Sequence, residues 1–444
     1  MLKLSRFSLR QILFTFAVAL VALLDPFGIS TSTDEASASW LNRLLASGYS
    51  DKGQQQVVVV LIDDAYLLRN QTFWPLPYSE QSKLFKRLLA YKPGAVFVDL
   101  LYTHDHSRAV PGQAPGMESQ LLANVFERYQ RQGIALFLAN NGTPPDAEDA
   151  INTLPRFAEV STPALVSWSD HGNQYPLAVQ TGLGPMETPA LKLYREYCRR
   201  HDCASLPSDA TAAAQRPDIA VQWGLRPSPL QGQAFDLGDC TLPGLADQFL
   251  QAVFWKLGNN AQANCTYTLT VSASALEATD SDDQALLRQL LQGKLVLVGA
   301  RIAGTGDVTL SPLHGKLAGV YVHAMALDNL VNWGMDYYRS TPDLAEFGIA
   351  KLDVLDVIEL LLLALIAHLK GTLDAPLFNR SFMGQPRRPR IAPLAAWALV
   401  FGLLVVLTTA LWLKNYTPAN VFGLSLLSLT LFSTRFQALF ANRT

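Results

Sequence analysis

The chain has 444 residues, of which 49% are hydrophobic and 16% are charged, with a formal net charge of −2. Soluble domains carry about 25% charged residues, so this composition excludes a disordered chain, a coiled coil and an ordinary cytosolic enzyme. The charge is divided unevenly, because residues 30–350 contain 23 basic and 32 acidic side chains while the other residues contain 12 and 5. An acidic block between basic, apolar ends does not fit a nucleic-acid partner.

The first element in the chain is an apolar stretch at residues 7–29, which holds the run ILFTFAVALVALL, and this run is preceded by Lys3, Arg6 and Arg10. A helix of about 17–25 apolar residues crosses the hydrocarbon layer, so residues 1–29 predict an N-terminal transmembrane helix. A cleaved signal peptide is the alternative, with Ala36-Ser37-Ala38 as its cleavage site. That site lies about a dozen residues beyond the apolar run, which favours the uncleaved helix.

The acidic block alternates between predicted strands and predicted helices. Continuous apolar runs predict strands buried on both faces of a sheet, with the first of them central. The predicted strands are Val57–Asp64, Ala95–Tyr102, Ile134–Ala139 and Lys294–Gly299. We expect a helix capped by Ser79, a second at Glu118–Gln132 and a third at Val320–Trp333. Thr188-Pro189 predicts the start of another helix that runs toward Arg200, with Thr188 as the cap and Pro189 at the first helical position. We therefore expect an α/β fold with a mostly parallel sheet and flanking helices.

Three further apolar runs near the C-terminus predict three more transmembrane helices. They cover about Val354–Leu369, Ile391–Leu413 and Ala419–Phe440. We expect the first of them to continue a helix that begins at Asp343. Basic residues concentrate before the first span, in the loop 370–390 and at the C-terminal end, and the positive-inside rule places those segments in the cytoplasm. The predicted organisation is an N-terminal transmembrane helix at 1–29, an extracytoplasmic domain at 30–350 that faces the periplasm or the exterior, and a three-helix membrane region at 351–444.

Three acidic residues recur every three positions at the outer end of the second predicted span. They are Asp353, Asp356 and Glu359. Ionisable groups at membrane depth usually face protein or water, so one interpretation is a face for a partner helix or an ion. The other, which we favour, is that these groups lie at the membrane surface.

All four cysteines lie in the predicted extracytoplasmic block, where thiols oxidise. They are Cys198, Cys203, Cys240 and Cys265, and they allow three pairings. The preferred pairing is Cys198–Cys203 with Cys240–Cys265, because each bond closes a short local loop. A metal site is the rival interpretation, but the segment CRRHDC lacks the spacing of zinc sites.

Acidic side chains follow three of the predicted strands. Asp63 and Asp64 end the first, Asp99 lies near the end of the second, and Asp307 follows a glycine loop after the last. Ligands of open α/β sheets gather beyond the carboxyl ends of the strands, and clustered carboxylates repel each other unless a cation or basic ligand is present. The sequence thus predicts a site for a basic ligand or a divalent cation. The alternative is that these acids cap helices and fix loops.

Two histidines, His104 and His106, follow the second strand at alternate positions and could add imidazole ligands for a metal. Exposed histidines are more often plain surface groups. The chain contains no nucleophile-elbow, zinc-protease or kinase motif. We therefore expect a protein that is not an enzyme.

The motifs VVVVLIDD, WPLP and AVFVDLLY, followed downstream by KLVLVGARIAGTGDVTLSPL and GVYVHAMALDNLVN, resemble the second class of CHASE domain. This module is the extracytoplasmic sensory domain of bacterial receptors, and the resemblance spans about Val57–Asn332. It implies ligand-binding roles for Asp63, Asp99, Asp307 and Trp74. Tyr78 stands where the family has an arginine, so a ligand contact made by that arginine does not carry over.

Receptors of this class usually continue into a cytoplasmic cyclase or kinase, which this sequence does not contain. Its cytoplasmic segments of about 11, 21 and 12 residues are each below the roughly 40 that could fold alone. We therefore expect a non-catalytic sensor that signals through a membrane or envelope partner, with a homo-oligomer also compatible. The alternatives are a structural subunit of an envelope assembly and a metal-dependent periplasmic hydrolase using Asp63, Asp99 and Asp307.

Overall fold

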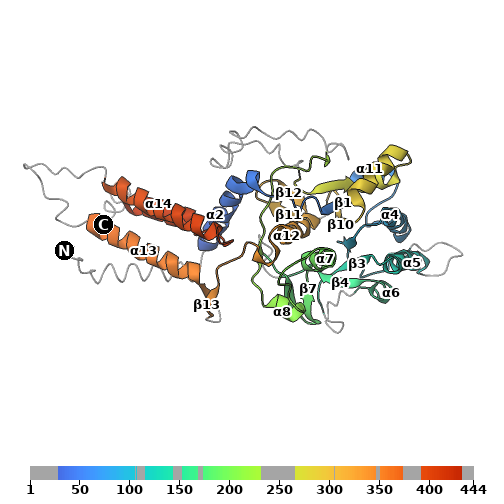
Figure 1. Cartoon of the computed structure of the whole chain (residues 1–444), viewed down its shortest axis with the longest axis horizontal. Helices are drawn as coiled ribbons and strands as arrows, with labels where there is room; N and C mark the ends of the chain where they lie inside the picture. The colour runs from blue at the N-terminus through green and yellow to red at the C-terminus, as the bar shows by residue number, and fades with distance from the viewer. Residues whose placement is uncertain are drawn as a thin grey trace, which may run out of the picture. The chain divides into compact units, whose positions relative to one another are not determined.

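A computed structural model describes most of the chain (Figure 1). The described residues are 29–105, 107, 116–143, 153–168, 174–231, 266–304, 306–346, 351–373 and 392–432. Contacts divide the chain into two units: a domain formed by Asn42–Tyr338, and a second unit formed by Met1–Leu41 with Arg339–Thr444.

The domain is built on a sheet of six parallel strands in the order β4-β3-β2-β10-β1-β9. In chain order, the strands are β1 (Val57–Asp63), β2 (Ala95–Val98), β3 (Ala135–Asn140), β4 (Thr162–Leu165), β9 (Leu269–Ser272) and β10 (Leu295–Arg301). The predicted α/β fold with a mostly parallel sheet is confirmed. The first strand is not central, however, because it lies second from one edge, next to β9.

The sheet is covered on both faces, and the residues of β1 show why. Alternate side chains of a strand point to opposite faces. Val57, Val59 and Leu61 pack into one hydrophobic cluster, and Val58, Val60 and Ile62 into the other, each at most 3% exposed. Burying a valine or leucine side chain contributes about 1.5–3 kcal/mol, so this run strongly favours a strand covered on both faces.

Helices α7 (Pro189–Cys198) and α12 (Val320–Trp333) contribute to the first cluster, and helices α4 (Tyr78–Ala90), α5 (Met117–Arg131) and α11 (Ser281–Leu291) to the second. The predicted helices correspond to α4, α5, α7 and α12. Thr188 is the N-cap residue of α7, as predicted, although its hydroxyl donates to the carbonyl oxygens of Pro176 and Leu177. The predicted cap of α4 is wrong, because Ser79 lies inside the helix and Pro77 precedes it.

The sequence interpretation missed the short elements of the domain. The short helices are η1 (Ala46–Gly48), α3 (Asp64–Arg69), α6 (Pro155–Ala158), α8 (Ala210–Ala214), η3 (Ala273–Glu277) and η4 (Gly334–Asp336). The antiparallel pairs are β5 (Gln174–Tyr175) with β8 (Ile219–Ala220), β6 (Ala178–Thr181) with β7 (Gly184–Glu187), and β11 (Val308–Ser311) with β12 (Gly315–Ala318). These segments are too short for a clear hydrophobic period, which is the signal that identified the longer elements.

The second unit contains a β-hairpin and three apolar helices. The hairpin joins β13 (Asp343–Glu346) to β14 (Lys351–Asp353), and the helices are α13 (Val354–Leu373), α14 (Ala392–Trp412) and α15 (Val421–Phe432). The predicted continuous helix from Asp343 is therefore wrong. The helix starts at Val354 because Asp353 and Asp356 cap each other's backbone N–H groups, each at 2.8 Å.

Helix α2 (Ile29–Leu45) begins in the second unit, and its last four residues belong to the domain. In the second unit, Thr33 accepts a hydrogen bond from the Asn420 amide at 2.8 Å, and Ser37 accepts one from the Phe422 N–H at 3.1 Å. Glu359 accepts the Asn420 N–H at 2.7 Å. The Glu359 side chain thus connects α13 to the residue before α15 by a hydrogen bond. It therefore has a partner within the chain, in addition to any contact with the membrane surface.

Among the described helices, one segment, Leu394–Trp412 within α14, is long and apolar enough to cross a membrane. Helix α13 has 20 residues but includes Asp356, Glu359 and Lys370, and α15 as described has 12. The described helices therefore do not support the three C-terminal spans that the sequence predicted. The predicted N-terminal span lies outside the described residues up to residue 28.

Candidate functional site

The strand order marks one edge of the sheet as the place where a ligand would bind. After β1 and β2 the chain forms α4 and α5, which pack on one face, whereas after β10 it forms α12 on the other face. Ligands of open α/β sheets bind beyond the carboxyl ends of strands where the helices change face. In this domain that position is the carboxyl end of β10 with its neighbours β1 and β2.

Asp99 lies at this position, directly after β2. Its backbone N–H continues the sheet by donating to the carbonyl oxygen of Val298 on β10 at 2.8 Å, and its side chain is 12% exposed. Burial, and then the negative charge of Asp307, raises the pKa of Asp99 to about 8. The Asp99 carboxyl is therefore largely protonated at neutral pH unless a positive charge or a hydrogen-bond donor arrives beside it.

His323 on α12 faces Asp99 from above the first face of the sheet. Its Nε2 atom lies 4.0 Å from the Asp99 Oδ2 atom, and its Nδ1 atom lies 2.8 Å from the hydroxyl of Tyr175. The imidazole contacts Phe97 and Trp168 edge-on, and its side chain is only 5% exposed. The ring is thus held between one acid and one phenol in an apolar surrounding, where electrostatic interactions are stronger than in water.

The Tyr175 hydroxyl extends the chain of polar groups to α7. It accepts a hydrogen bond from the backbone N–H of Ala190, in the first turn of α7, at 3.2 Å. Burial raises the pKa of Tyr175, so the phenol stays protonated. A single series of groups therefore connects the carboxyl edge, helix α12 and the start of helix α7.

Asp307 forms the outer end of this series. The residue is exposed, but one carboxylate oxygen lies against Gly319, where an added Cβ atom would stand 2.0 Å from the Asp307 Oδ1 atom. This partial desolvation raises the pKa of Asp307. We call Asp307, Asp99, His323 and Tyr175 the carboxyl-edge cluster. It runs from the solvent to a fully buried phenol.

Asp63 and Asp64 do not join the cluster. Asp63 caps α3 by accepting the Tyr66 N–H at 2.8 Å, and Asp64 accepts the Ala303 N–H at 3.2 Å. Strand β10 separates β1 from β2, so Asp63 and Asp99, which the sequence predicted to share one site, lie at the ends of strands that are not neighbours. Two strand spacings correspond to about 9–10 Å. Both acids make the contacts of the alternative interpretation, in which they cap helices and fix loops.

Trp74 and Tyr78 lie on the other face of the sheet. Trp74 precedes a cis peptide bond to Pro75 and packs, partly buried, against the second hydrophobic cluster. Tyr78 is 1% exposed and donates a hydrogen bond from its hydroxyl to the carbonyl oxygen of His104 at 2.6 Å. Where the resemblance implies an arginine, this chain therefore has a buried tyrosine that fixes the segment after β2.

The structure gives little support for the metal ligands predicted after β2. His104 is exposed, with its Nδ1 atom 2.9 Å from the Thr103 hydroxyl, and His106 lies outside the described residues. Within the described ranges, no three His, Cys, Asp or Glu side chains are close enough to hold one metal ion. Metal binding by His104 and His106 stays a prediction.

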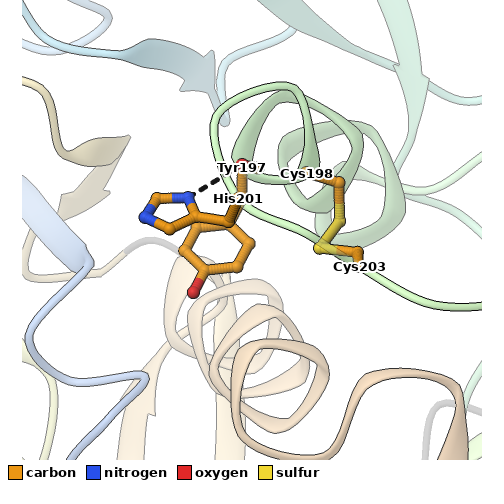
Figure 2. Close-up of a disulfide and its surroundings, with 4 residues drawn as sticks. All are labelled: Tyr197, Cys198, His201 and Cys203. Carbon is orange, nitrogen blue, oxygen red and sulfur yellow. Dashed lines mark hydrogen bonds between the residues drawn. A yellow bond between two sulfur atoms is a disulfide. The ribbon is translucent and has the colours of Figure 1, made fainter.

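The Cys198–Cys203 disulfide is present at the end of α7, with the two Cα atoms 5.4 Å apart (Figure 2). Inside the loop it closes, the His201 ring stacks on the Tyr197 ring with centroids 3.9 Å apart. The His201 Nδ1 atom lies 3.0 Å from the Tyr197 carbonyl oxygen. Cys240 and Cys265, predicted to form the second bond, lie outside the described residues.

His323 and Tyr175 were missed by the sequence interpretation. His323 lies within the apolar segment VYVHAMA, where a histidine is expected to be an ordinary core residue. Tyr175 belongs to a two-residue strand, which is too short to be predicted from the sequence. The one available signal was the position of His323, in the first turns of the helix that follows the glycine loop of Asp307. Its partner Asp99 could not be identified from the sequence, because the contact joins residues more than 200 positions apart.

The fold places a buried acid and an imidazole at the carboxyl edge of a parallel α/β sheet, which is the edge where ligands of such sheets bind. The model of one family, the CHASE2 domain, matches residues 14–367. The chain therefore belongs to the CHASE2 family of extracytoplasmic sensory domains. This match extends beyond Val57–Asn332 at both ends, into the N-terminal apolar stretch and most of α13. Searches of curated proteins and of solved structures found no match.

Proposed function

We propose that this chain is a non-catalytic bacterial inner-membrane sensor whose carboxyl-edge cluster responds to a ligand or an envelope protein. The observation that carries the proposal is the buried contact between Asp99 and His323 at the position where α/β domains bind ligands, in a chain of a sensory family. A buried acid beside an imidazole changes its proton occupancy when a charged group approaches. This property supports a sensing role without requiring a reaction.

The cluster favours a ligand that carries a positive charge or hydrogen-bond donors. Asp307 and Asp99 repel each other when both are ionised, and this repulsion helps to raise the pKa of Asp99. A cation between them would remove the repulsion and favour their ionised forms. A small amine satisfies this requirement with few ligands. A divalent cation at the same edge stays a prediction, and it would need further oxygen ligands from water or backbone.

The membrane part of the proposal is attachment to the bacterial inner membrane, with the domain outside the cytoplasm. The segment Leu394–Trp412 within α14 supports this attachment, and α13 and α15 pack against α14 through one apolar cluster that includes Ile366, Val400 and Leu424. The predicted cytoplasmic segment 370–390, whose first four residues belong to α13, is shorter than the roughly 40 residues that can fold alone. We therefore propose that the signal passes through contacts of these helices with a membrane partner or a second copy of the chain.

The experiment is a thermal-shift measurement on the full chain in lipid nanodiscs, with small amines, Mg²⁺ and Ca²⁺ as probes. A probe at a hundredfold excess over its Kd stabilises the folded state by about 2.7 kcal/mol, equivalent to about 5–10 °C in melting temperature. We expect Asp99→Asn to abolish the shift. Asp283→Asn, which alters an exposed acid in the first turn of α11, is the matched control and should respond as the wild type does.

A second candidate function is an oligomerising subunit of an envelope assembly. It is favoured by the exposed apolar side chains of Val308 and Leu310 on β11, which are 57% and 69% exposed. Two residues apart on a strand, they point to the same side of the hairpin. Rings or stacks of the full chain that form without any probe, and that disappear in Leu310→Asp, would favour this function over sensing.

A further inference from the structure

A second polar group lies on α12, one and a half turns after His323. Asp328 is fully buried, and its Oδ1 atom accepts hydrogen bonds from the Tyr49 hydroxyl and from the Asn332 side-chain amide, each at 2.7 Å. Its Oδ2 atom is buried without a hydrogen-bond partner among the described residues. Tyr49 lies in the segment that connects α2 to β1. We call residues 46–56 the junction, and Tyr49, Asp328 and Asn332 the latch.

The surroundings of the latch fix the position of the junction. The Asn329 side chain donates to the Tyr49 hydroxyl at 2.7 Å, so this hydroxyl accepts from Asn329 and donates to Asp328. The Tyr49 ring contacts Tyr267 and Trp333 edge-on, with centroids 5.1 and 5.3 Å away. An added Cβ atom on Gly53 would lie 2.4 Å from the Asp328 carboxyl carbon, so the junction backbone lies directly against this acid.

The groups that face Asp328 come from three parts of the chain. Tyr49 and Asp51 face it from the junction, Tyr267 from the segment before β9, and Asn332 from α12 itself. None of these described neighbours is cationic. Burial is the largest cause that raises the pKa of Asp328, to about 8. The carboxyl is therefore neutral at neutral pH, and a neutral acid is the form that this closed surrounding accommodates.

The same helix connects this group to the end of α2 by a second route. Asn329 accepts the Gln222 N–H at 2.8 Å and donates to the Gln222 carbonyl oxygen at 2.8 Å. The next residue, Trp223, donates its N–H to the Asn42 side chain at 3.3 Å, in the last turn of α2. Two adjacent residues of α12 thus hold both the end of α2 and the junction that follows it.

We propose that the latch links the carboxyl-edge cluster to the junction through helix α12, so that a change at Asp99 alters how firmly the junction is held. This proposal rests on the proposed function of the cluster as the sensory site. His323 and Asp328 are five residues apart, about 7.5 Å along a helix, and a rigid helix moves both together. The junction follows α2 directly in the chain. The hydrogen bonds that hold the junction therefore limit how far the end of α2 can move relative to the domain.

The test is amide hydrogen exchange of the junction, measured by mass spectrometry on the full chain in nanodiscs without any ligand. Tyr49→Phe removes the hydroxyl that holds the junction to Asp328, and we expect junction exchange at least tenfold faster. Asp99→Asn, at the other end of the link, should change junction exchange at least threefold. Tyr129→Phe is the matched control, because its hydroxyl donates to Phe85 on the opposite face of the sheet. It should leave the junction unchanged.

The outcomes separate this proposal from the proposed function. Unchanged junction exchange in Tyr49→Phe would refute the latch. Faster exchange in Tyr49→Phe, with no effect of Asp99→Asn, would make the latch a purely local fastening and refute the link. If Tyr49→Phe does not fold, Asn332→Ala removes a single donor to Asp328, and an increase of at least threefold is then required. Failure of every probe in the thermal-shift experiment would count against the proposed ligand site and leave this measurement valid.

Discussion

Replacing Asp328 by asparagine should make the protein more stable at neutral and mildly alkaline pH. The substitution keeps the shape of the side chain and one oxygen that can accept from Tyr49, but it removes the ionisable group. In the folded protein the pKa of Asp328 is raised to about 8, whereas an unfolded aspartate titrates near its usual value of 3.8. The folded state therefore holds a proton that the unfolded state releases at intermediate pH.

The sign and size of the effect follow from this difference. Between the unfolded pKa of 3.8 and the folded pKa of about 8, the unfolded state binds fewer protons, so the free energy of unfolding falls as pH rises. The loss is at most about 1.4 kcal/mol per pH unit, which corresponds to about 3–5 °C in melting temperature. Above about pH 8 both states are ionised, and the curve levels off.

The assay is the melting temperature of the full chain in nanodiscs, measured at each pH unit from 5 to 9. We expect the wild-type melting temperature to fall over this range, and the difference between Asp328→Asn and the wild type to grow with pH until about pH 8. Asp283→Asn, an exposed acid, is the control and should follow the wild type. Parallel curves for the wild type and Asp328→Asn would refute the reasoning, because Asp328 would then titrate alike in both states.

Three further predictions concern the cluster and the core. His323→Leu leaves the buried Tyr175 hydroxyl without its imidazole partner and should lower the free energy of unfolding by about 1–3 kcal/mol in chemical denaturation; an unchanged midpoint would contradict the contact. Gly319→Ala places a Cβ atom 2.0 Å from the Asp307 Oδ1 atom and so displaces that carboxylate. It should weaken any amine-induced thermal shift at least tenfold in probe concentration, and an undisturbed shift would remove Asp307 from the site. Leu297→Ala, in the fully buried centre of β10, should lower stability by about 2–5 kcal/mol, whereas Leu310→Ala on the exposed hairpin should change it by less than about 0.5. Equal losses in these two variants would contradict the burial pattern.

Much of the fold could be predicted because its main elements carry strong local signals. Continuous apolar runs identified β1, β2, β3 and β10, and the helical period identified α4, α5, α7 and α12 within a few residues. The strand order could not be predicted. β10 lies between β1 and β2 although it comes about 200 residues after β2 in the chain, and no local pattern records which strands pair.

The site was predicted only in part, and for the same reason. Asp99 and Asp307 were found because acids at strand ends are visible in the sequence. Asp63 and Asp64 give the same signal, but they accept hydrogen bonds from backbone N–H groups of α3 and of the loop after β10. His323 and Asp328 were hidden because a polar residue inside an apolar helix has no visible partner until the fold places one. The hairpin at 343–353 was missed because an apolar helix follows it directly.

The central claim is that residues 42–338 form a sensory domain outside the cytoplasm, and membrane-impermeant thiol labelling tests it most directly. A cysteine introduced at Ser281, the exposed first residue of α11, is probed in spheroplasts with an intact inner membrane. We predict full labelling before lysis. Labelling that appears only after the inner membrane is broken would place the domain in the cytoplasm and contradict the account.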